Sequence, residues 1–197
     1  MTLRVLGIDP GLTRCGVGIV DVTATRKATL VHVTVIRTTP ETVLEQRLLQ
    51  LGQQLESLLA EYKPDAVALE RVFAQQNLKT VMGTAQASGV AMLLAARQGL
   101  AVGLHTPSEV KASVTGYGSA NKKQVATMVA RLLGLDSLPT PADASDALAL
   151  AICHAWKAGT STPTGAGVGT AQTPAQQAWR AAERSAAKSA AARRVEP

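Results

Sequence analysis

Four acidic residues lie at positions where a fold can bring them together. Asp9 ends one apolar segment that we predict to be a strand, and Glu70 ends another. Asp143 and Asp146 stand three residues apart near the start of a predicted helix, so they share one face of it. Each has an ordinary structural explanation alone, because an acid suits a Pro-Gly turn, a sheet edge or the start of a helix. Their combination is more informative than any one of them.

A cluster of four carboxylates repels itself, and the sequence places no group of Lys or Arg residues beside these acids to neutralise them. Divalent cations would do so. Oxygen-only ligands favour a hard ion such as Mg²⁺ or Mn²⁺. Two such ions about 4 Å apart can activate a water and stabilise the leaving oxygen of a phosphodiester. The four acids therefore predict a metal-dependent site, with Asp9 as the bridging ligand and Asp146 as either a ligand or a water-positioning base.

The elements that must position these acids are indicated by hydrophobic periodicity and by turn residues. Strands are predicted over residues 3–9, 16–23, 28–38, 66–70 and 101–106. Helices are predicted from Pro40 to Lys63, over 77–98, from Pro107, over 122–133 and from Pro141 to Lys157. The order begins with three strands in a meander and continues with helix-linked strands. It predicts the α/β class, with a mixed five-stranded sheet covered by helices on both faces.

This arrangement brings the four acids to one place. A right-handed crossover puts strand 66–70 parallel to strand 3–9 and beside it, so that Asp9 and Glu70 end at the same edge of the sheet. Sites of α/β proteins lie at that edge. The last helix continues into apolar residues such as Leu150, which indicates that it faces the core. It can therefore carry its two acids over the same edge.

Several local signals set the expected helices. Thr39 is the predicted N-cap of the first helix, before Pro40 at its first position. Its apolar stripe is expected to comprise Leu44, Leu48, Leu51, Leu55 and Leu58. Asn121 should cap helix 122–133, and Gly134 should end it. Helix 77–98 is rich in small residues, which suit a core helix and also close approach of a second chain.

Composition sets wider limits. The chain has 197 residues, of which 46% are hydrophobic, enough for one domain with a single core. We expect a nuclease domain at 1–157 and a disordered tail rich in Ala, Thr, Gly and Arg at 158–197. Neither a signal peptide nor a membrane span is expected, and Cys15 and Cys153 suit buried thiols of a cytoplasmic protein. The net charge of +6 permits a nucleic-acid partner, especially if four acids face inward onto metal ions.

Four ordered segments resemble the signatures of a known family. They are LGIDPGLTRCGVGIVD, ALERVFAQQN, HTPSEVKASVTGYGSANKKQV and PADASDALALAICH, spread over roughly residues 3–157. They look like those of RuvC, the bacterial Holliday-junction resolvases, which are homodimers with a ribonuclease-H-like fold. The family's catalytic, metal-binding acids match Asp9, Glu70, Asp143 and Asp146. Some members have histidine at one of the two helix positions, where this sequence has aspartate. The tail has no counterpart to which a function can be attached.

The resemblance implies an activity. A homodimer would bind a four-way DNA junction and make paired symmetric nicks by metal-dependent phosphodiester hydrolysis, in homologous recombination and DNA repair. The nicks would leave 5′-phosphate and 3′-hydroxyl ends and would favour a short sequence that contains TT. The cofactor would be Mg²⁺, which Mn²⁺ can replace, with two ions per subunit. The RuvA–RuvB branch-migration complex would be a partner.

Residues for DNA contact follow partly from the resemblance. Phe73, the only phenylalanine, stands in a polar setting where the family places an aromatic. It suits a wedge or stacking platform for an unstacked base, although a core position is the alternative. Lys111 and Lys122 fall in segments where the family has basic residues near the scissile phosphate; a solvated helix face is the alternative for both. Weaker candidates for phosphate contacts are Lys123, Lys79, Arg14 and Arg71.

Other functions compete with this interpretation. The segment IDPGLT resembles the first phosphate loop of the actin and sugar-kinase superfamily. Such a kinase needs two domains of this kind around ATP, whereas this chain has room for one. A junction-binding module without catalysis would explain the basic charge and Phe73, but it leaves four acids facing DNA unexplained. A general nuclease of the same fold is the third alternative. His105 and His154 are expected to be structural.

Overall fold

The computed structural model describes residues 2–72 and 78–158, with the side chains of 78–80 left out. The strands are β1 (Thr2–Asp9), β2 (Arg14–Thr23), β3 (Ala28–Arg37), β4 (Ala66–Glu70) and β5 (Ala101–His105). The helices are α1 (Leu44–Tyr62), α2 (Leu78–Arg97), α3 (Pro107–Thr115), α4 (Lys122–Leu133) and α5 (Ala142–Ala158). Every predicted strand and helix is therefore present.

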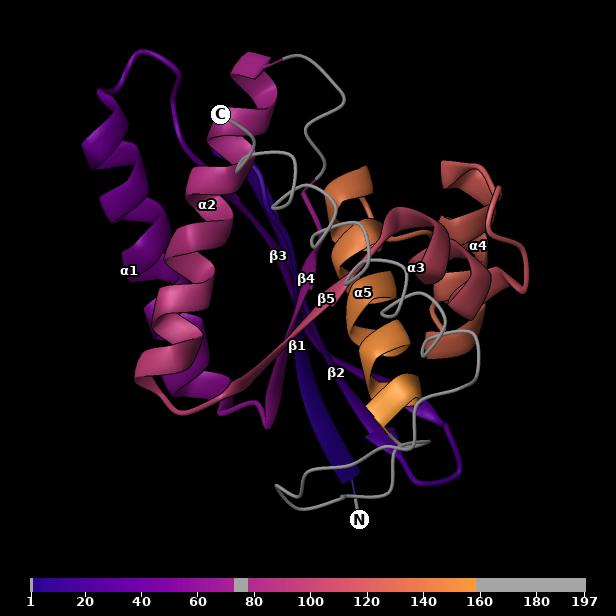
Figure 1. Ribbon diagram of the computed structural model, residues 1–197. Helices are drawn as coiled ribbons and strands as arrows, with labels where there is room; N and C mark the ends of the chain where they lie inside the picture. Colours follow the sequence, from indigo (N-terminus) through magenta and orange to yellow (C-terminus); the bar gives the residue numbers. More distant parts are fainter. Residues whose placement is uncertain (1, 73–77, 159–197) are drawn as a thin grey trace, which may run out of the picture. The chain divides into compact units, whose positions relative to one another are not determined.

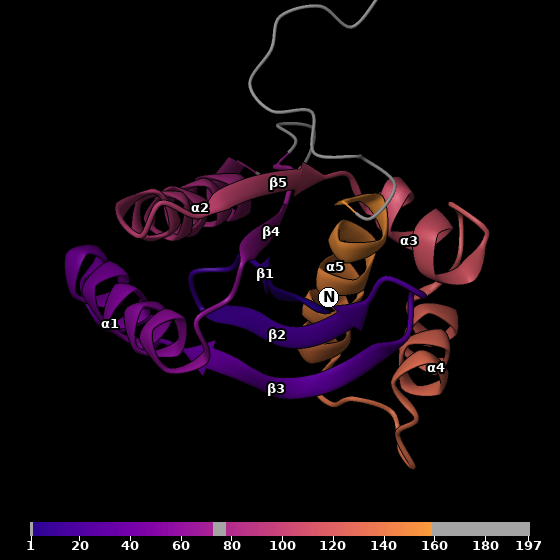
Figure 2. The ribbon, with the colours of Figure 1, turned by 90° about the horizontal axis from the view of Figure 1, so that it is seen from below.

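The strands form one mixed sheet in the order β3-β2-β1-β4-β5 (Figure 1). β1, β2 and β3 pair antiparallel, whereas β4 is parallel to both β1 and β5. Helices α1 and α2 cover one face of the sheet, and α5, with α3 and α4 beside it, covers the other (Figure 2). Each face has its own cluster of buried apolar side chains. The predicted α/β class, the five-stranded mixed sheet and the placement of β4 beside β1 are confirmed.

A row of glycines on β1 and β2 lets α5 lie unusually close to the sheet. Gly7 pairs with Gly18 across the two strands, and Asp9 pairs with Gly16. A Cβ atom on Gly7 would overlap the backbone of α5 at Ala147, and one on Gly18 would lie 2.8 Å from the Leu148 nitrogen. Side chains at these positions would hold the helix away. The glycine row thus sets how close α5 lies to the sheet and which part of the helix contacts it.

The start of α1 differs from the prediction. The helix begins at Leu44 with Val43 as its N-cap, and no side chain caps it. Thr39 is not the cap, because the residues after it form a separate turn closed by a hydrogen bond from the Thr42 N–H to the Thr39 carbonyl. The apolar stripe is also shifted: the buried residues of α1 are Leu51, Leu55 and Leu59, while Leu44 is exposed and Leu58 is only partly buried.

The helices around the predicted site begin and end as their sequences indicate. Asn121 forms a capping box with Gln124 at the start of α4, and Gly134 ends the helix in the left-handed conformation. Thr106 forms a second capping box with Glu109 at the start of α3, with Pro107 at the first position. These caps hold α3 and α4 at fixed starting points beside α5, which matters because both helices line the site described below.

The predictions for the cysteines, the histidines and membrane spans agree with the structure, and the prediction for the tail is not tested. Both cysteines are free and buried, as expected. His105 and His154 hydrogen-bond to each other, Nε2 to Nδ1, over 3.0 Å, in agreement with a structural role. Within the described residues, no helix is long and apolar enough to cross a membrane. The expected tail begins at Ala158, the last described residue, so its disorder stays a prediction.

Replacing Gly7 by alanine should destabilise the fold, because the new methyl group would meet the Ala147 carbonyl oxygen and lie 2.7 Å from the Ala151 nitrogen. Forcing α5 outward should cost about 1–3 kcal/mol in urea unfolding. Gly52→Ala in α1 is the matched control, since its added Cβ would lie at an ordinary contact distance, 3.5 Å from Val90 Cγ1. That variant should be as stable as the wild type or more stable by about 0.5–1 kcal/mol. Equal losses for the two variants would contradict the account of the glycine row.

Candidate active site

Asp9 and Glu70 come together because of strand register. Ile8 of β1 pairs with Leu69 of β4, and the next residue of each strand is the acid. Both strands are parallel, so both acids leave the sheet at the same edge. Burial falls at this point: Ile8 and Leu69 are buried, and the two acids that follow are half-buried. The predicted meeting of Asp9 and Glu70 is confirmed by the placement of both side chains in one pocket.

Helix α5 brings the other two acids to this edge. A Cβ atom on Gly16 would overlap the carbonyl oxygen of Asp143, so the first turn of α5 lies directly on the start of β2. Because Gly16 is the residue paired with Asp9, this contact sets Asp143 beside Asp9. Asp146 follows one turn later on the same helix. The sequence prediction that α5 faces the core is confirmed, since Ala147, Leu148 and Leu150 are buried.

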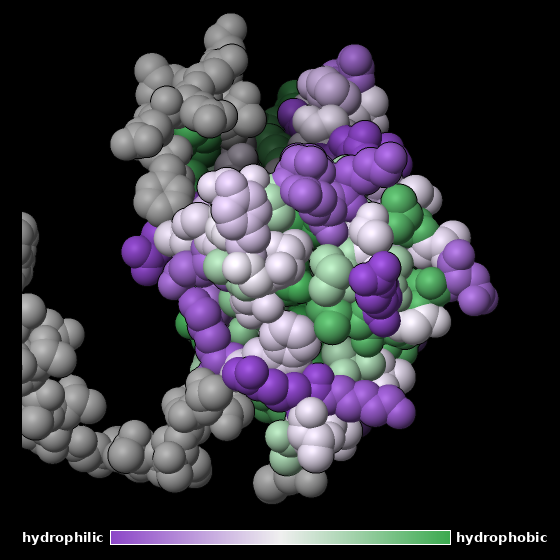
Figure 3. Space-filling view, turned by 90° about the vertical axis from the view of Figure 1, so that its right-hand side faces the viewer, coloured by the Kyte–Doolittle hydropathy of each residue, from purple (hydrophilic) through white to green (hydrophobic). Residues whose placement is uncertain are grey.

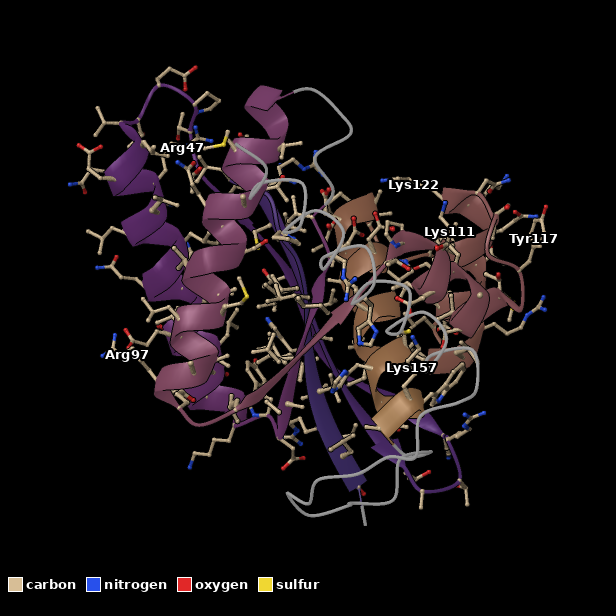
Figure 4. The ribbon with its side chains drawn as sticks, viewed as in Figure 1. Arg47, Arg97, Lys111, Tyr117, Lys122 and Lys157 are labelled. Atoms are coloured by element: carbon tan, nitrogen blue, oxygen red, sulfur yellow. The ribbon has the colours of Figure 1, made fainter. Side chains whose placement is uncertain are left out.

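Three of the four acids line a pocket of about 230 Å³ between β1, β4, α3, α4 and α5, and Asp143 is not among its lining residues. Its polar lining consists of Asp9, Glu70, Asp146, Lys111 and Lys122. Its apolar lining consists of Pro107, Val110, Val125, Ala149 and Leu150. Acid groups therefore lie on the sheet side and on α5, and two ammonium groups lie on α3 and α4. Figure 4 shows Lys111 and Lys122 at this end of the molecule.

The electrostatics of the cluster are unfavourable to its own ionisation. Burial, and after it the charges of neighbouring acids, together raise the pKa of Asp9 to about 7. Those acids are Glu70, Asp146 and Asp143. The pKa of Glu70 is also raised, first by burial and then by Asp146. Only Lys122, and for Glu70 also Lys111, acts in the opposite direction. Perturbed carboxyl groups that gather in a pocket are typical of a functional site.

Two cations bind the acids, which corrects one expectation. Arg14 donates a hydrogen bond from Nε to Asp143 over 2.7 Å, and Lys122 forms an ion pair with Asp146 over 3.1 Å. The pKa of Lys122 is raised, chiefly by the charge of Asp146. The sequence had shown no basic group clustered with the acids. That inference was wrong because both partners are distant in the chain and reach the acids only through the fold.

As the side chains stand, no three carboxylate, imidazole or thiol groups of the described residues are gathered so that they could hold one ion. In this arrangement Asp143 is bound to Arg14 and Asp146 to Lys122. The donor set nevertheless fits a hard divalent cation, being made of oxygen ligands alone. Burial and the charges of neighbouring acids raise the pKa of Asp9, and a bound cation would favour its ionised form. Release of Asp146 by Lys122 would free a further ligand.

The lysines predicted to contact DNA do not all lie in one pocket. Lys111 and Lys122 line the pocket, and their contact with a phosphate stays a prediction. Lys123 lines a different hollow, beside Tyr117 and Met128. That hollow belongs to α4 and the loop before it. Figure 3 shows this side of the molecule, where hydrophilic side chains lie above and below a smaller hydrophobic area.

Three further residues were predicted to contact DNA, and the structure describes the side chain of only one of them. Phe73 lies outside the described residues, and so does the side chain of Lys79. Arg71 is exposed just beyond β4, where its N–H donates to the His105 carbonyl. The glycine row was not predicted from the sequence, although Gly16 and Gly18 alternate in one strand opposite Gly7 in its neighbour. No role was predicted for Arg47.

Comparison with known proteins gives the family. The sequence profile of the family described as "Crossover junction endodeoxyribonuclease RuvC" matches residues 5–154. The proteins of that name from Leifsonia xyli and Clavibacter michiganensis are each 63% identical to this chain. The match covers 98% of this chain and 98% of the first protein, and 92% and 97% for the second.

Solved structures agree. The chain superimposes on Thermus thermophilus RuvC in complex with a Holliday junction substrate with a TM-score of 0.76 and 35% identity, over 79% of this chain and 94% of that one. The mixed sheet and the helices on its two faces are those of the ribonuclease-H-like fold, as the resemblance implied. With its acids at one sheet edge and its match along residues 5–154, this chain belongs to the RuvC family of crossover junction endodeoxyribonucleases.

Proposed function

We propose that this chain resolves Holliday junctions through magnesium-dependent hydrolysis at the cluster of Asp9, Glu70, Asp143 and Asp146. The nuclease activity and the junction substrate follow from the family. The observation that supports these four residues as the catalytic, metal-binding site is their convergence at one sheet edge, where the pKa of Asp9 is raised to about 7. A binding module without catalysis would gain nothing from this arrangement, since buried acids oppose contact with DNA.

The residues of the pocket divide into two groups by charge. When bound, two Mg²⁺ ions per subunit, or Mn²⁺ in their place, would offset the carboxylates and activate the attacking water. Asp9 is the most central ligand, because three other acids influence its pKa. Lys111 and Lys122 can bind the phosphate that enters from the side of α3 and α4. Lys122 would then exchange Asp146 for the DNA, which couples substrate binding to release of that carboxylate.

A homodimer is the proposed assembly, with α2 in the contact. Ala87, Ala91 and Ala95 of α2 are buried against the sheet and α1. On its other side Met82 is 57% exposed and Leu93 is 60% exposed. Large apolar side chains that are left in water on a helix with a buried opposite face suit a protein contact. Two subunits would supply two sites for paired, symmetric nicks.

The remaining proposals rest on the family resemblance. We propose that Phe73 contacts an unpaired base at the junction, and that Lys79, Lys123 and Arg14 contact the DNA backbone. The RuvA–RuvB complex is the proposed partner in homologous recombination and repair. The cytoplasm is the proposed location, being the compartment of bacterial chromosomal DNA.

Incubation with a synthetic four-way junction tests the activity. With Mg²⁺ the wild type should nick two opposed strands, whereas Asp9→Asn should lose at least about 100-fold in rate, because the central ligand loses its charge. Denaturing gels of labelled strands measure both. Chelation by EDTA should abolish the nicking, and added Mn²⁺ should restore it.

Linear duplex of the same sequence is the matched control substrate. Cutting of the duplex as fast as the junction would indicate a general nuclease of this fold. Junction binding by the wild type without nicking under any divalent cation would exclude the catalytic proposal. Arg97→Ala should behave as the wild type, since Arg97 lies at the opposite end of the molecule (Figure 4).

The raised pKa of Asp9 also predicts an effect on stability. A carboxyl group whose folded-state pKa is above its unfolded value binds more protons when folded, so its contribution to stability falls as pH rises from about 4 to 7. Without divalent cations, Asp9→Asn should therefore melt higher than the wild type, and the gain should be larger at pH 8 than at pH 5. Thermal unfolding at the two pH values measures it. A lower melting temperature for Asp9→Asn at pH 8 would show that the acid is not held at an energetic cost.

A further inference from the structure

Arg47, in the first turns of α1, is held in an unusual way. Its Nε donates to Thr38 Oγ1 over 2.9 Å, and its Nη2 donates to Thr13 Oγ1 over 2.7 Å. Thr38 is buried, and its hydroxyl in turn donates to the Leu12 carbonyl. Two neutral hydroxyls thus orient the guanidinium at the turn that follows Asp9. This leaves Nη1, with its two N–H groups, without a partner among the described residues.

Arg47 also lacks a counter-charge. No carboxylate of the described residues forms an ion pair with it. Glu45 is two residues away on the helix and so lies on a different side of it. An arginine that is fixed in orientation, half-buried and not neutralised is ready to bind an anion, because its fork of donors matches carboxylate or phosphate oxygens.

Two further arginines lie at this end of the sheet. Arg14 of β2 pairs directly with Arg37 of β3 in the sheet. Like charges that face each other across two strands are destabilising. Arg14 is bound to Asp143, but Arg37 is exposed and has no acidic partner among the described residues. Arg14 lies beside Arg47 in one hollow, whereas Arg37 is not among the residues that line it. The charge at this end of the sheet that calls for an anionic ligand is therefore that of Arg47.

A hollow of about 400 Å³ is available for this ligand. It is lined by Gly11, Leu12, Thr13, Arg14, Arg47, Gly83 and Thr84, and we call it the Arg47 hollow. Arg14 belongs both to this hollow and, through Asp143, to the carboxylate cluster. Figure 4 shows Arg47 on one side of the sheet and Lys111 and Lys122 on the other, all at the same end. The carboxylates therefore have basic groups on both sides.

We infer that the Arg47 hollow binds a backbone phosphate of the junction, with Arg47 as its main contact and Thr13 and Arg14 at its wall. The inference rests on the proposed function, because it takes the substrate to be DNA cut at the carboxylate cluster. The strand would be held at two points, by Lys111 and Lys122 on the side of α4 and by Arg47 on the side of α1. The scissile phosphate would lie between them.

The salt dependence of junction binding in EDTA tests this inference. Loss of one phosphate contact should reduce the slope of log K against log salt by about 0.9, and should weaken binding about five- to tenfold at 0.1 M salt. We expect both effects for Arg47→Ala. Arg97→Ala is the matched control: it removes an exposed arginine near the opposite end of the neighbouring helix, and its slope should stay that of the wild type.

Arg47 also ties the Leu12–Thr13 turn to α1, so a structural effect must be separated from a DNA contact. Arg47→Lys keeps the charge but loses the fork between the two hydroxyls. It should keep most of the slope if phosphate is the ligand, whereas a purely structural role would make it as defective as Arg47→Ala. If Arg47→Ala does not fold, Arg47→Gln removes the charge while keeping a donor for one hydroxyl, and the same comparison applies.

Two results would overturn the inference: a wild-type slope for the folded uncharged variant, or failure of Arg47→Lys to keep more slope than that variant. These outcomes are distinct from failure of the proposed function. If the proposed function fails, the wild type itself does not bind or nick the junction. Wild-type nicking together with an unchanged slope in Arg47→Gln would reject the phosphate site alone.

Discussion

The close seating of α5 on the glycine row of β1 and β2 is the constraint on which the site depends. Gly7, Gly16 and Gly18 remove the side chains that would otherwise separate helix and sheet, and the backbone of α5 takes that space. Since Gly16 pairs with Asp9, the contact between Gly16 and Asp143 connects strand register directly to the active site. Packing of small residues in the core thereby sets the relative positions of acids that are more than 130 residues apart in sequence.

The cost of this arrangement is electrostatic. Burial and the charges of neighbouring acids raise the pKa of Asp9, and burial and Asp146 raise the pKa of Glu70. Arg14 and Lys122 relieve part of this cost by binding Asp143 and Asp146. They are also the basic groups that connect the cluster to its surroundings, through the Arg47 hollow on one side and α4 on the other. We interpret both ion pairs as contacts that a divalent cation and a DNA phosphate would replace.

The positions of the four acids could be predicted because they follow from rules that act at long range. Strand ends, the handedness of crossovers and the apolar face of the last helix were sufficient to place them at one edge. The ion pairs could not be predicted, because they depend on which side chains α4 and the start of β2 present to α5. The start of α1 was mispredicted for a similar reason: Thr39-Pro40 suits a helix start, but Thr39 takes part in a separate turn beside Thr38, which Arg47 and Leu12 hold in place.

A crystal structure with Mn²⁺, located by its anomalous scattering, tests the central claim most directly. The account predicts manganese at the sheet edge with Asp9 as a ligand of every ion there, and with oxygen distances near 2.0–2.2 Å to Glu70 and to at least one of the two α5 aspartates. Lys122 should have released Asp146 in that structure. Manganese bound elsewhere, or an edge that stays without it while Asp143 and Asp146 remain paired with Arg14 and Lys122, would contradict the account.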